Sequence, residues 1–203
     1  MKRAPPDVVL ERLALVLNML RDRELFILGG ASPHYQHILF MGGAMYSDTS
    51  SWRLKAYMAS IYLPEIGARA IGYKETDPRL KRHEIPILRS CLRHPTHPFS
   101  GMPVRDFLEL GHMNVRGYYK TVKQRKWPAK PFDLRALHNA WVLKVLEEAI
   151  ANEYANDPDR YYRYLLNRFE GHSILMKRLK KIWSMLKRPY VQDKMQTYLI
   201  DKK

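Results

Sequence analysis

Residues 25–56, LFILGGASPHYQHILFMGGAMYSDTSSWRLKA, decide the fold class of this chain. Two short apolar runs within them, residues 25–28 and 44–46, predict strands, because continuous apolar runs of this length are typical of buried parallel strands. Helical patterns cover residues 33–41 and 52–62, and each follows one of the predicted strands. The order strand, helix, strand, helix predicts an α/β fold with a parallel sheet or a barrel.

The alternation of helix and strand begins before this stretch. Pro5, Pro6 and Asp7 open a pattern of apolar residues at helical spacing that reaches Leu20. We therefore predict that residues 1–75 form an α-β-α-β-α segment.

The chain changes character beyond this segment. Residues 76–132 are rich in charged residues and prolines, and we expect an irregular basic connector there, since proline interrupts helices and central strands. Residues 133–203 carry three helical patterns, whose predicted N-caps are Asp133, Asp157 and Ser173. We expect a basic helical region at this end of the chain.

The chain is strongly basic, because 35 Lys and Arg outnumber 20 Asp and Glu and give a net charge of +15 over 203 residues. This excess favours a polyanionic partner, since neutralised phosphates release counterions and drive association. We expect nucleic acid; an anionic membrane surface, or no such partner at all, are the alternatives. The single cysteine fits a reducing compartment, and no apolar run approaches the roughly 20 residues of a membrane span, so we expect a cytoplasmic protein.

Two clusters of basic residues carry the prediction of a nucleic-acid partner. Residues 116–130 interleave Lys and Arg with three aromatic residues, and residues 172–191 contain no acidic residue. Basic side chains among aromatic ones suit phosphate contact with base stacking; the alternative is a solvated helix face with the tyrosines packed inward. The residues predicted to contact nucleic acid are Lys120, Lys123, Arg125, Lys126, Lys130, Lys177, Arg178, Lys180 and Lys181.

Two loops after the predicted strands carry candidate site residues, because ligands of α/β folds bind at the carboxyl ends of strands. Gly29 and Gly30 follow the first strand, where glycine lets the backbone approach a ligand, and a tight turn is the alternative. Asp48 follows the second strand, and its carboxylate could act as a nucleophile, as a general base or only as a helix cap. The residues alone leave these roles open.

Residues 26–56 resemble the carboxyl-terminal part of the barrel of the tRNA-guanine transglycosylases, the queuine and archaeosine tRNA-ribosyltransferases. The similarity includes a strand that ends in a Gly-rich turn before Ser-Pro, and GAMYSDT at residues 43–49, with Ser47 where the family prefers Phe. LHNAW at residues 137–141 resembles the Leu-His-Asn helix start of the family. The resemblance implies the last strands and helices of a TIM-type (β/α)8 barrel, incomplete here and followed by a basic α-helical extension.

The resemblance also implies a reaction. In that family a carboxylate attacks C1′ of the ribose, guanine leaves, and a 7-deazaguanine base attacks the same carbon. Asp48 would be the nucleophile, and Gly29, Gly30 and Ser47 would bind the base. The substrate, tRNA or DNA, stays open, and a non-catalytic nucleic-acid-binding subunit is the alternative. Two strands cannot close a barrel, so we expect one piece of a split enzyme, a fragment of a longer gene, or a divergent relative that completes its sheet by association. A second protein chain or a dimer partner would supply the missing strands.

A zinc site is the last feature that the resemblance implies. The family uses Cys-x-Cys-x-x-Cys together with the His of Leu-His-Asn. This chain has a single cysteine, and its candidate ligands are Cys91, His94, His97 and His138. Thiolate and imidazole both suit zinc. The alternative is a proline-rich loop with exposed histidines and an ordinary helical residue at position 138.

Overall fold

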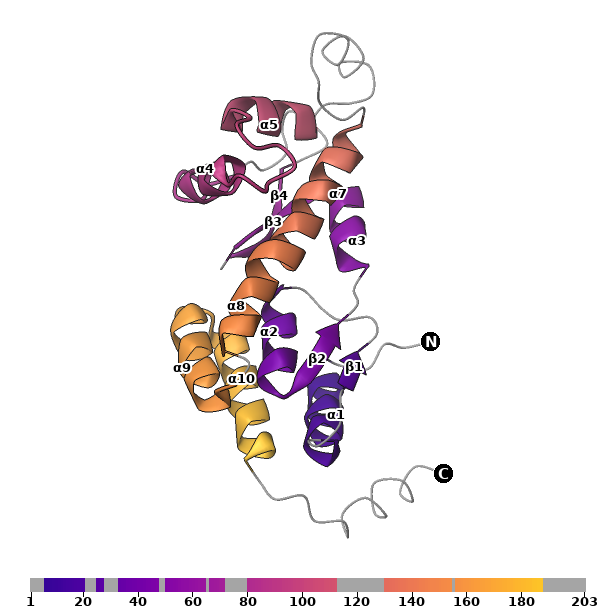
Figure 1. Ribbon diagram of the computed structural model, residues 1–203, viewed down its shortest axis with the longest axis vertical. Coiled ribbons are helices and arrows are strands. Elements are labelled where there is room, and N and C mark those ends of the chain that lie inside the picture. The colour runs from indigo at the N-terminus through magenta and orange to yellow at the C-terminus, as the bar shows by residue number, and fades with distance from the viewer. Residues whose placement is uncertain are drawn as a thin grey trace. The chain divides into compact units, whose positions relative to one another are not determined.

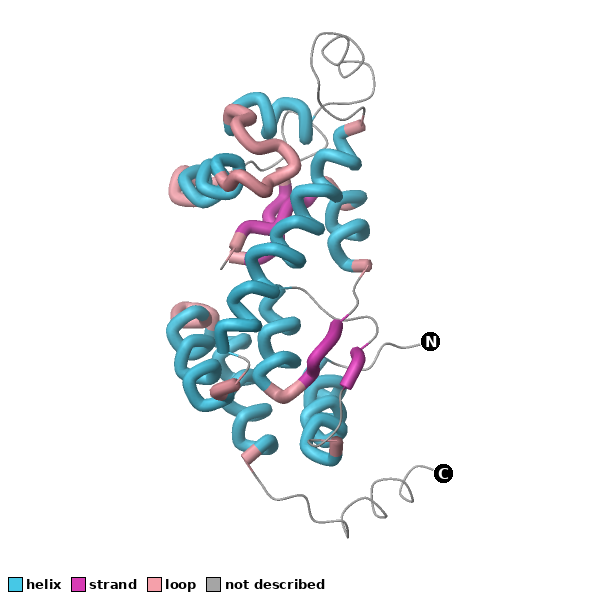
Figure 2. The backbone as a smooth tube through the Cα atoms, in the orientation of Figure 1, coloured by secondary structure: helices cyan, strands magenta, loops and turns pink. Residues whose placement is uncertain are grey.

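The computed structural model of the protein describes residues 6–20, 25–27, 33–47, 50–64, 66–71, 80–112, 130–154 and 156–187. Helices make up most of these residues, and the strands are short (Figure 2). No helix in these ranges has both the length and the apolar character needed to cross a bilayer. The chain forms two compact units: the first draws on Met1–Ile27, Ile38–Tyr46 and Tyr154–Lys203, and the second on Leu28–His37 and Ser47–Glu153.

The predicted alternation of helix and strand is confirmed at the amino-terminal end of the chain (Figure 1). The elements in order are α1 (Pro6–Met19), β1 (Leu25–Ile27), α2 (Pro33–Met41), β2 (Ala44–Ser47) and α3 (Ser51–Tyr57). β1 and β2 pair in a two-stranded sheet. α2 ends in a turn where Gly43 has a φ of +96°, a conformation that favours glycine. The protein is thus mostly helical, with short strands between its first helices.

A β-hairpin follows α3, where the sequence pattern predicted that the helix continues to residue 62. β3 (Ser60–Leu63) pairs antiparallel with β4 (Gly67–Ala70). The helix stops because Ala59 adopts a left-handed φ of +49°, which no α-helix contains. The longer helix was wrong because the apolar run at residues 61–63, fully buried here, fits a buried strand as well as a helix.

Two helices of the second unit lie in the stretch predicted to be irregular. They are α4 (Ile85–Arg93) and α5 (Val104–His112). Pro86 lies in the first turn of α4, where a missing backbone N–H costs no helical hydrogen bond. A proline can therefore open a helix as well as interrupt one, and this part of the stretch is regular.

The longest helical segment runs from α7 (Pro131–Trp141) through a π-helical turn, η1 (Val142–Glu147), into α8 (Glu148–Tyr154). Lys130 is the N-cap of α7, so Asp133 lies in the first turn and not at the cap predicted for it. α7 packs against α3, α5 and β3. The buried core of this unit includes Ile61, Leu63, Ile71, Leu88, Leu92, Phe99, Phe107, Leu110 and Leu134.

In the first unit, α1 packs against α10 (Ser173–Leu186), which follows α9 (Pro158–Arg168). The predicted cap of α9 is confirmed, because the Asp157 carboxylate accepts a hydrogen bond of 2.8 Å from the backbone N–H of Arg160. The predicted cap of α10 was wrong: Ser173 is already helical, and His172 precedes it at the cap position.

The strands of the described residues form two separate pairs, β1 with β2 and β3 with β4. The second pair is antiparallel. A (β/α)8 barrel consists of parallel strands joined by helices, so the hairpin is not a barrel element. Within the described ranges the fold is a mixed architecture of helices and short strands.

Candidate functional site

The residues implied to carry catalysis lie around the ends of β1 and β2. β2 ends at Ser47, so Asp48 is the first residue after this strand, and β1 ends two positions before Gly29. Asp48, Gly29 and Gly30 lie outside the described residues, as does the side chain of Ser47. Their predicted roles therefore stay predictions, and the described site-like features belong to the second unit and to the helices α9 and α10.

Two of the four candidate zinc ligands, His97 and His138, form a buried hydrogen-bonded chain. His138 Nε2 lies 2.8 Å from the carbonyl oxygen of Tyr62 and must donate to it, so His138 Nδ1 carries a lone pair. His97 Nε2 lies 3.0 Å from that Nδ1 and donates to it, while His97 Nδ1 accepts from the backbone N–H of Phe99 at 3.0 Å. Every ring nitrogen of the two histidines thus has a partner.

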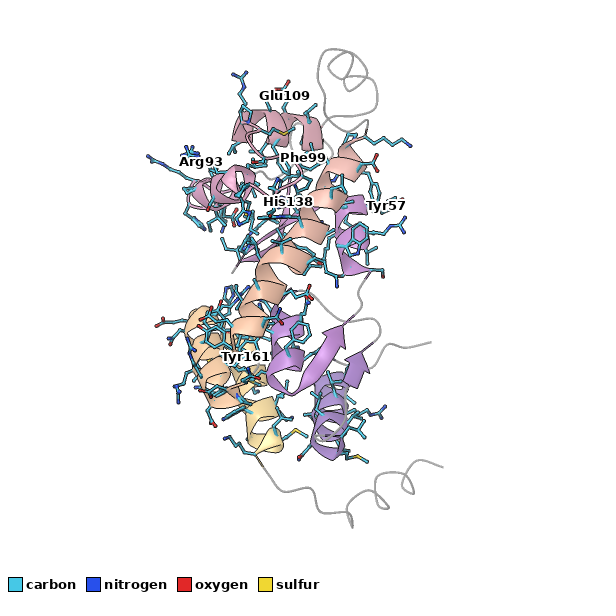
Figure 3. The ribbon with its side chains drawn as sticks, viewed as in Figure 1. Tyr57, Arg93, Phe99, Glu109, His138 and Tyr161 are labelled. Carbon is cyan, nitrogen blue, oxygen red and sulfur yellow. The ribbon has the colours of Figure 1, made fainter. Side chains whose placement is uncertain are left out.

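This chain of hydrogen bonds requires both imidazoles to be neutral, and their surroundings keep them so. Burial, together with the neighbouring His138 and His94, lowers the pKa of His97 to about 3. Burial lowers the pKa of His138 to about 4, although its bond to the Tyr62 carbonyl acts in the opposite direction. The two neutral rings, which also bind backbone groups, hold the segment between α4 and α5 against α7. Figure 3 labels Phe99 in that segment and His138 on α7.

Asn139, the next residue of the LHNAW segment, forms hydrogen bonds with the backbone of the hairpin strand β3. Asn139 Oδ1 accepts a hydrogen bond of 2.6 Å from the N–H of Tyr62, and Asn139 Nδ2 donates to the carbonyls of Trp52 and Ser60 at 3.1 Å each. His138 and Asn139 together satisfy both backbone groups of Tyr62 on the edge of β3 that β4 does not cover. In this protein, the two polar residues of the segment replace a neighbouring strand.

The other two candidate ligands, Cys91 and His94, take no part in this hydrogen-bonded chain. Cys91 is buried beside Tyr62 and Trp141, and burial raises the pKa of its thiol to about 12, with the Glu147 charge adding to the effect. His94 is half-buried, its ring 5.3 Å from that of Trp141, and its Nδ1 lies 2.9 Å from the Thr96 hydroxyl.

The four candidates do not form a ready zinc site. A zinc ligand must offer a free lone pair or a thiolate. The acceptor nitrogens of His97 and His138 are used by hydrogen bonds, and burial raises the pKa of the Cys91 thiol to about 12. Among the described residues, which include all four candidates, no three His, Cys, Asp or Glu side chains are grouped to hold a metal ion. The zinc site that the resemblance implies stays a prediction.

The second unit also contains buried charged groups that the sequence did not single out. His37 Nε2 lies 2.5 Å from Glu147 Oε2, and both side chains have no exposed surface. Arg135 is 4% exposed and donates to the carbonyl of Ala56 at 2.8 Å and to the carbonyl of Gly111. His37, Glu147 and Arg135 are ordinary residue types at helical positions, so no signal in the sequence distinguishes them.

The basic residues predicted to contact nucleic acid divide between described and undescribed parts of the chain. Lys177, Lys180 and Lys181 are exposed on α10, Arg178 is half-buried there, and Lys130 is exposed before α7. Lys181 pairs with Glu11 of α1. The remaining four, Lys120, Lys123, Arg125 and Lys126, lie outside the described residues. The described part of the prediction is a basic surface on α10.

Aromatic side chains accompany this basic surface. The rings of Tyr162 and Trp183 stack with centroids 4.5 Å apart and an interplanar angle of 6°, and Lys187 Nζ lies 4.7 Å from the Trp183 ring. On α9, Arg160 lies over the ring of Tyr154, which itself stacks on Tyr164 at 4.7 Å. Cations next to stacked rings are typical of surfaces that bind phosphates and bases together.

Comparisons with known proteins add no relative: no protein-family model, no curated protein and no solved structure matches this chain.

Proposed function

We propose that this chain is a transglycosylase-type protein that exchanges guanine for a 7-deazaguanine base in tRNA, with Asp48 as the nucleophile. The observation that carries the proposal is the end of β2 at Ser47, which makes Asp48 the first residue of the connection to α3. The paired strand β1 is followed in the same way by Gly29 and Gly30. Ligand-binding residues of α/β folds occupy such positions after strands.

The proposed chemistry uses one carboxylate twice. An Asp48 oxygen attacks C1′ of the guanosine ribose, the C1′–N9 bond breaks, and guanine leaves with the electron pair and takes up a proton. The incoming 7-deazaguanine then loses its N9 proton and attacks C1′, which releases the Asp48 carboxylate. Two inversions give net retention, as in retaining glycosidases. The target base must leave its stack before its sugar can be reached.

In this proposal the segment from α1 to α3 is the end of a (β/α)8-type barrel, which a partner must complete. Two strands leave two unpaired edges, and an isolated pair is marginal in water. The outer face of α3 supports a protein partner, because Leu54, Tyr57 and Met58 are 55%, 72% and 55% exposed at helical spacing. Figure 3 labels Tyr57 on this helix. The partner is a second protein chain or a second copy of this one.

A second candidate function is a nucleic-acid-binding subunit without catalysis. It is supported by the exposed lysines of α10 and the stacked rings beside them, which do not involve Asp48. A DNA substrate in place of tRNA is compatible with the same surface, since phosphate contacts are common to both nucleic acids. The two functions differ in whether a covalent bond to the nucleic acid forms.

Trapping of a covalent adduct tests the proposal. The full chain is incubated with tRNA or with duplex DNA, alone and together with the proteins encoded next to it, and denatured samples are examined for a protein–nucleic acid band. We expect a band with tRNA that Asp48→Asn abolishes while tRNA affinity is retained. Glu109→Gln, which removes an exposed carboxylate of α5 (Figure 3), is the matched control and should leave the band intact.

The outcomes separate the candidates. A band with DNA alone would move the proposal to the DNA substrate. If no band forms with any partner although tRNA binds tightly, the non-catalytic subunit is correct and the base-exchange proposal fails.

A further inference from the structure

The first unit contains a pocket of about 320 Å³ that the proposed base exchange does not use. Its walls come from α1, from the turn between α2 and β2, and from α9 and α10. The residues that matter for the argument are Leu17, Met41, Gly43, Asp159, Trp183 and Lys187. The described residues that line it include none to which the base exchange gives a role.

One side of the pocket is an aromatic ring that is already held in place. Tyr162 stacks on Trp183 with nearly parallel rings, 4.5 Å apart, and therefore occupies one face of the indole. Lys187 Nζ lies over the same ring, 4.7 Å from its centroid. An ammonium group is an easily displaced occupant of a ring face, because it can move into solvent on its flexible stem. A flat base can take its place against Trp183.

A carboxylate of the pocket lies next to the cation that covers Trp183. Asp159 Oδ1 and Oδ2 lie 2.9 and 3.0 Å from Lys187 Nζ, and the two side chains are 58% and 54% exposed. An exposed ion pair of this kind contributes little to stability, so it opens at small cost. Guanine presents two adjacent N–H donors on its Watson–Crick edge, which match the two oxygens of a carboxylate, whereas adenine does not. Lys187, once released, can reach a phosphate.

The remaining walls are apolar and rigid. A Cβ on Gly42 would lie 2.6 Å from Leu17 Cδ1, which shows how closely this turn packs on α1. Next to it, Gly43 has a φ of +96°, and a Cβ there would meet nothing within 4 Å, so the wall faces open space. Leu17 and Met41 are both nearly fully buried. Apolar walls with a few polar groups at the rim are typical of small-molecule sites.

From these contacts we propose that the pocket binds a guanine nucleotide. The base stacks on Trp183, its Watson–Crick edge pairs with Asp159, and its phosphate binds Lys187. The ligand is either a free nucleotide or an unpaired guanosine of an RNA strand, because both present the same base and phosphate. The proposal does not rest on base exchange, since it involves neither Asp48 nor the loops after β1 and β2.

The test measures binding to the full chain by titration calorimetry. The probes are GMP, AMP, guanosine and two single-stranded RNA hexamers, oligo-U and oligo-U with one central G. We expect GMP to bind at least about tenfold more tightly than AMP. Trp183→Leu should weaken GMP binding at least about tenfold, and Trp183→Phe, which keeps a ring, should retain most of it.

Two surface variants separate the polar contacts without affecting the core. Asp159→Asn should remove the preference for GMP over AMP. Lys187→Gln should remove the advantage of GMP over guanosine, whereas Lys144→Gln, an exposed lysine of the second unit, should change neither. Tighter binding of the hexamer with G than of oligo-U identifies the source as RNA, and binding of GMP alone identifies it as a free nucleotide.

Equal affinities for GMP and AMP, or an unchanged GMP affinity in both Trp183→Leu and Asp159→Asn, would overturn the guanine pocket. These results leave the trapped adduct untouched, because that experiment reports on Asp48. Conversely, loss of the adduct with intact GMP binding would remove the base-exchange proposal alone. The two proposals therefore fail separately.

Discussion

His97 donates its Nε2–H to Nδ1 of His138 across 3.0 Å, inside a core in which neither ring carries a charge. The pair connects the segment between α4 and α5 to the middle of α7, and through the Tyr62 carbonyl to β3. Three separate parts of the sequence are thus joined by two neutral imidazoles. Their first consequence is for stability.

We expect His138→Ala to lower the free energy of unfolding by about 2–4 kcal/mol. The substitution removes a fully buried ring and leaves the His97 donor and the Tyr62 carbonyl without partners. Urea unfolding followed by tryptophan fluorescence measures the change. His83→Ala, at an exposed position before α4, is the control and should stay within about 0.5 kcal/mol of the unsubstituted chain. A similar small effect for His138→Ala would contradict the structural role.

The pH dependence of stability follows from the lowered pKa values of His97 and His138, about 3 and about 4 in the fold against 6.5 ordinarily. Between these values the unfolded chain binds more protons than the folded one, so stability rises with pH. Going from pH 7 to pH 5 should therefore cost about 2 kcal/mol for each of the two histidines.

Urea midpoints at pH 5, 6 and 7 check this prediction. Burial acts to raise the pKa of Glu84, but the Lys81 N–H and Arg69 bind its carboxylate and lower that pKa overall. Glu84 therefore loses its contribution to the free energy of unfolding only below its ordinary pKa of 4.5. It therefore lies outside the pH range of the measurement. A midpoint that does not move between pH 5 and pH 7 would mean that the two histidines take up protons as readily in the fold as in the unfolded chain.

Cys91 should be almost unreactive in the folded chain. Its thiol is 3% exposed, and burial raises its pKa to about 12, so very little thiolate exists at pH 8. Because the chain has one cysteine, labelling by Ellman's reagent follows this residue alone. We expect labelling to become fast and stoichiometric in urea, at the rate of a free thiol. Rapid labelling without denaturant would show that Cys91 is accessible and would reopen its role as a ligand.

The lysines of α10 should contribute to RNA affinity through phosphate contacts. Lys177→Gln and Lys180→Gln remove exposed charges, and each should weaken tRNA binding and reduce the slope of log affinity against log salt concentration by about 1. Arg89→Gln on α4, also exposed, is the control. Filter binding between 50 and 300 mM salt gives the slopes. Identical slopes for all variants would place the phosphate contacts elsewhere on the chain.

The hydrogen bonds of Asn139 to β3 and to Trp52 should stabilise the hairpin. Asn139→Ala leaves the N–H of Tyr62 and the carbonyls of Trp52 and Ser60 without their side-chain partner. We expect a loss of about 2–3 kcal/mol and faster hydrogen exchange at the Tyr62 amide. Asn152→Ala, at an exposed position on α8, is the matched control. Unchanged protection of the Tyr62 amide would show that Asn139 does not hold this strand.

The sequence by itself determined the local elements that have strong local signals. The alternation from α1 to α3, and the start of α9 at Asp157, follow from apolar spacing and from a capping carboxylate that bonds within one turn. The length of α3 was missed, because residues 61–63 form a continuous apolar run that is fully buried. Such a run does not distinguish a helix from a buried strand.

Tertiary structure alone decided the polar contacts of the second unit. His97 and His138 are 41 positions apart, and His37 and Glu147 are 110 apart, so no local pattern reveals that they meet. The sequence singled out His138 but could not tell a zinc ligand from a hydrogen-bonded core residue. That difference depends on which groups face its two ring nitrogens, and only the folded chain brings the Tyr62 carbonyl and the His97 donor to them.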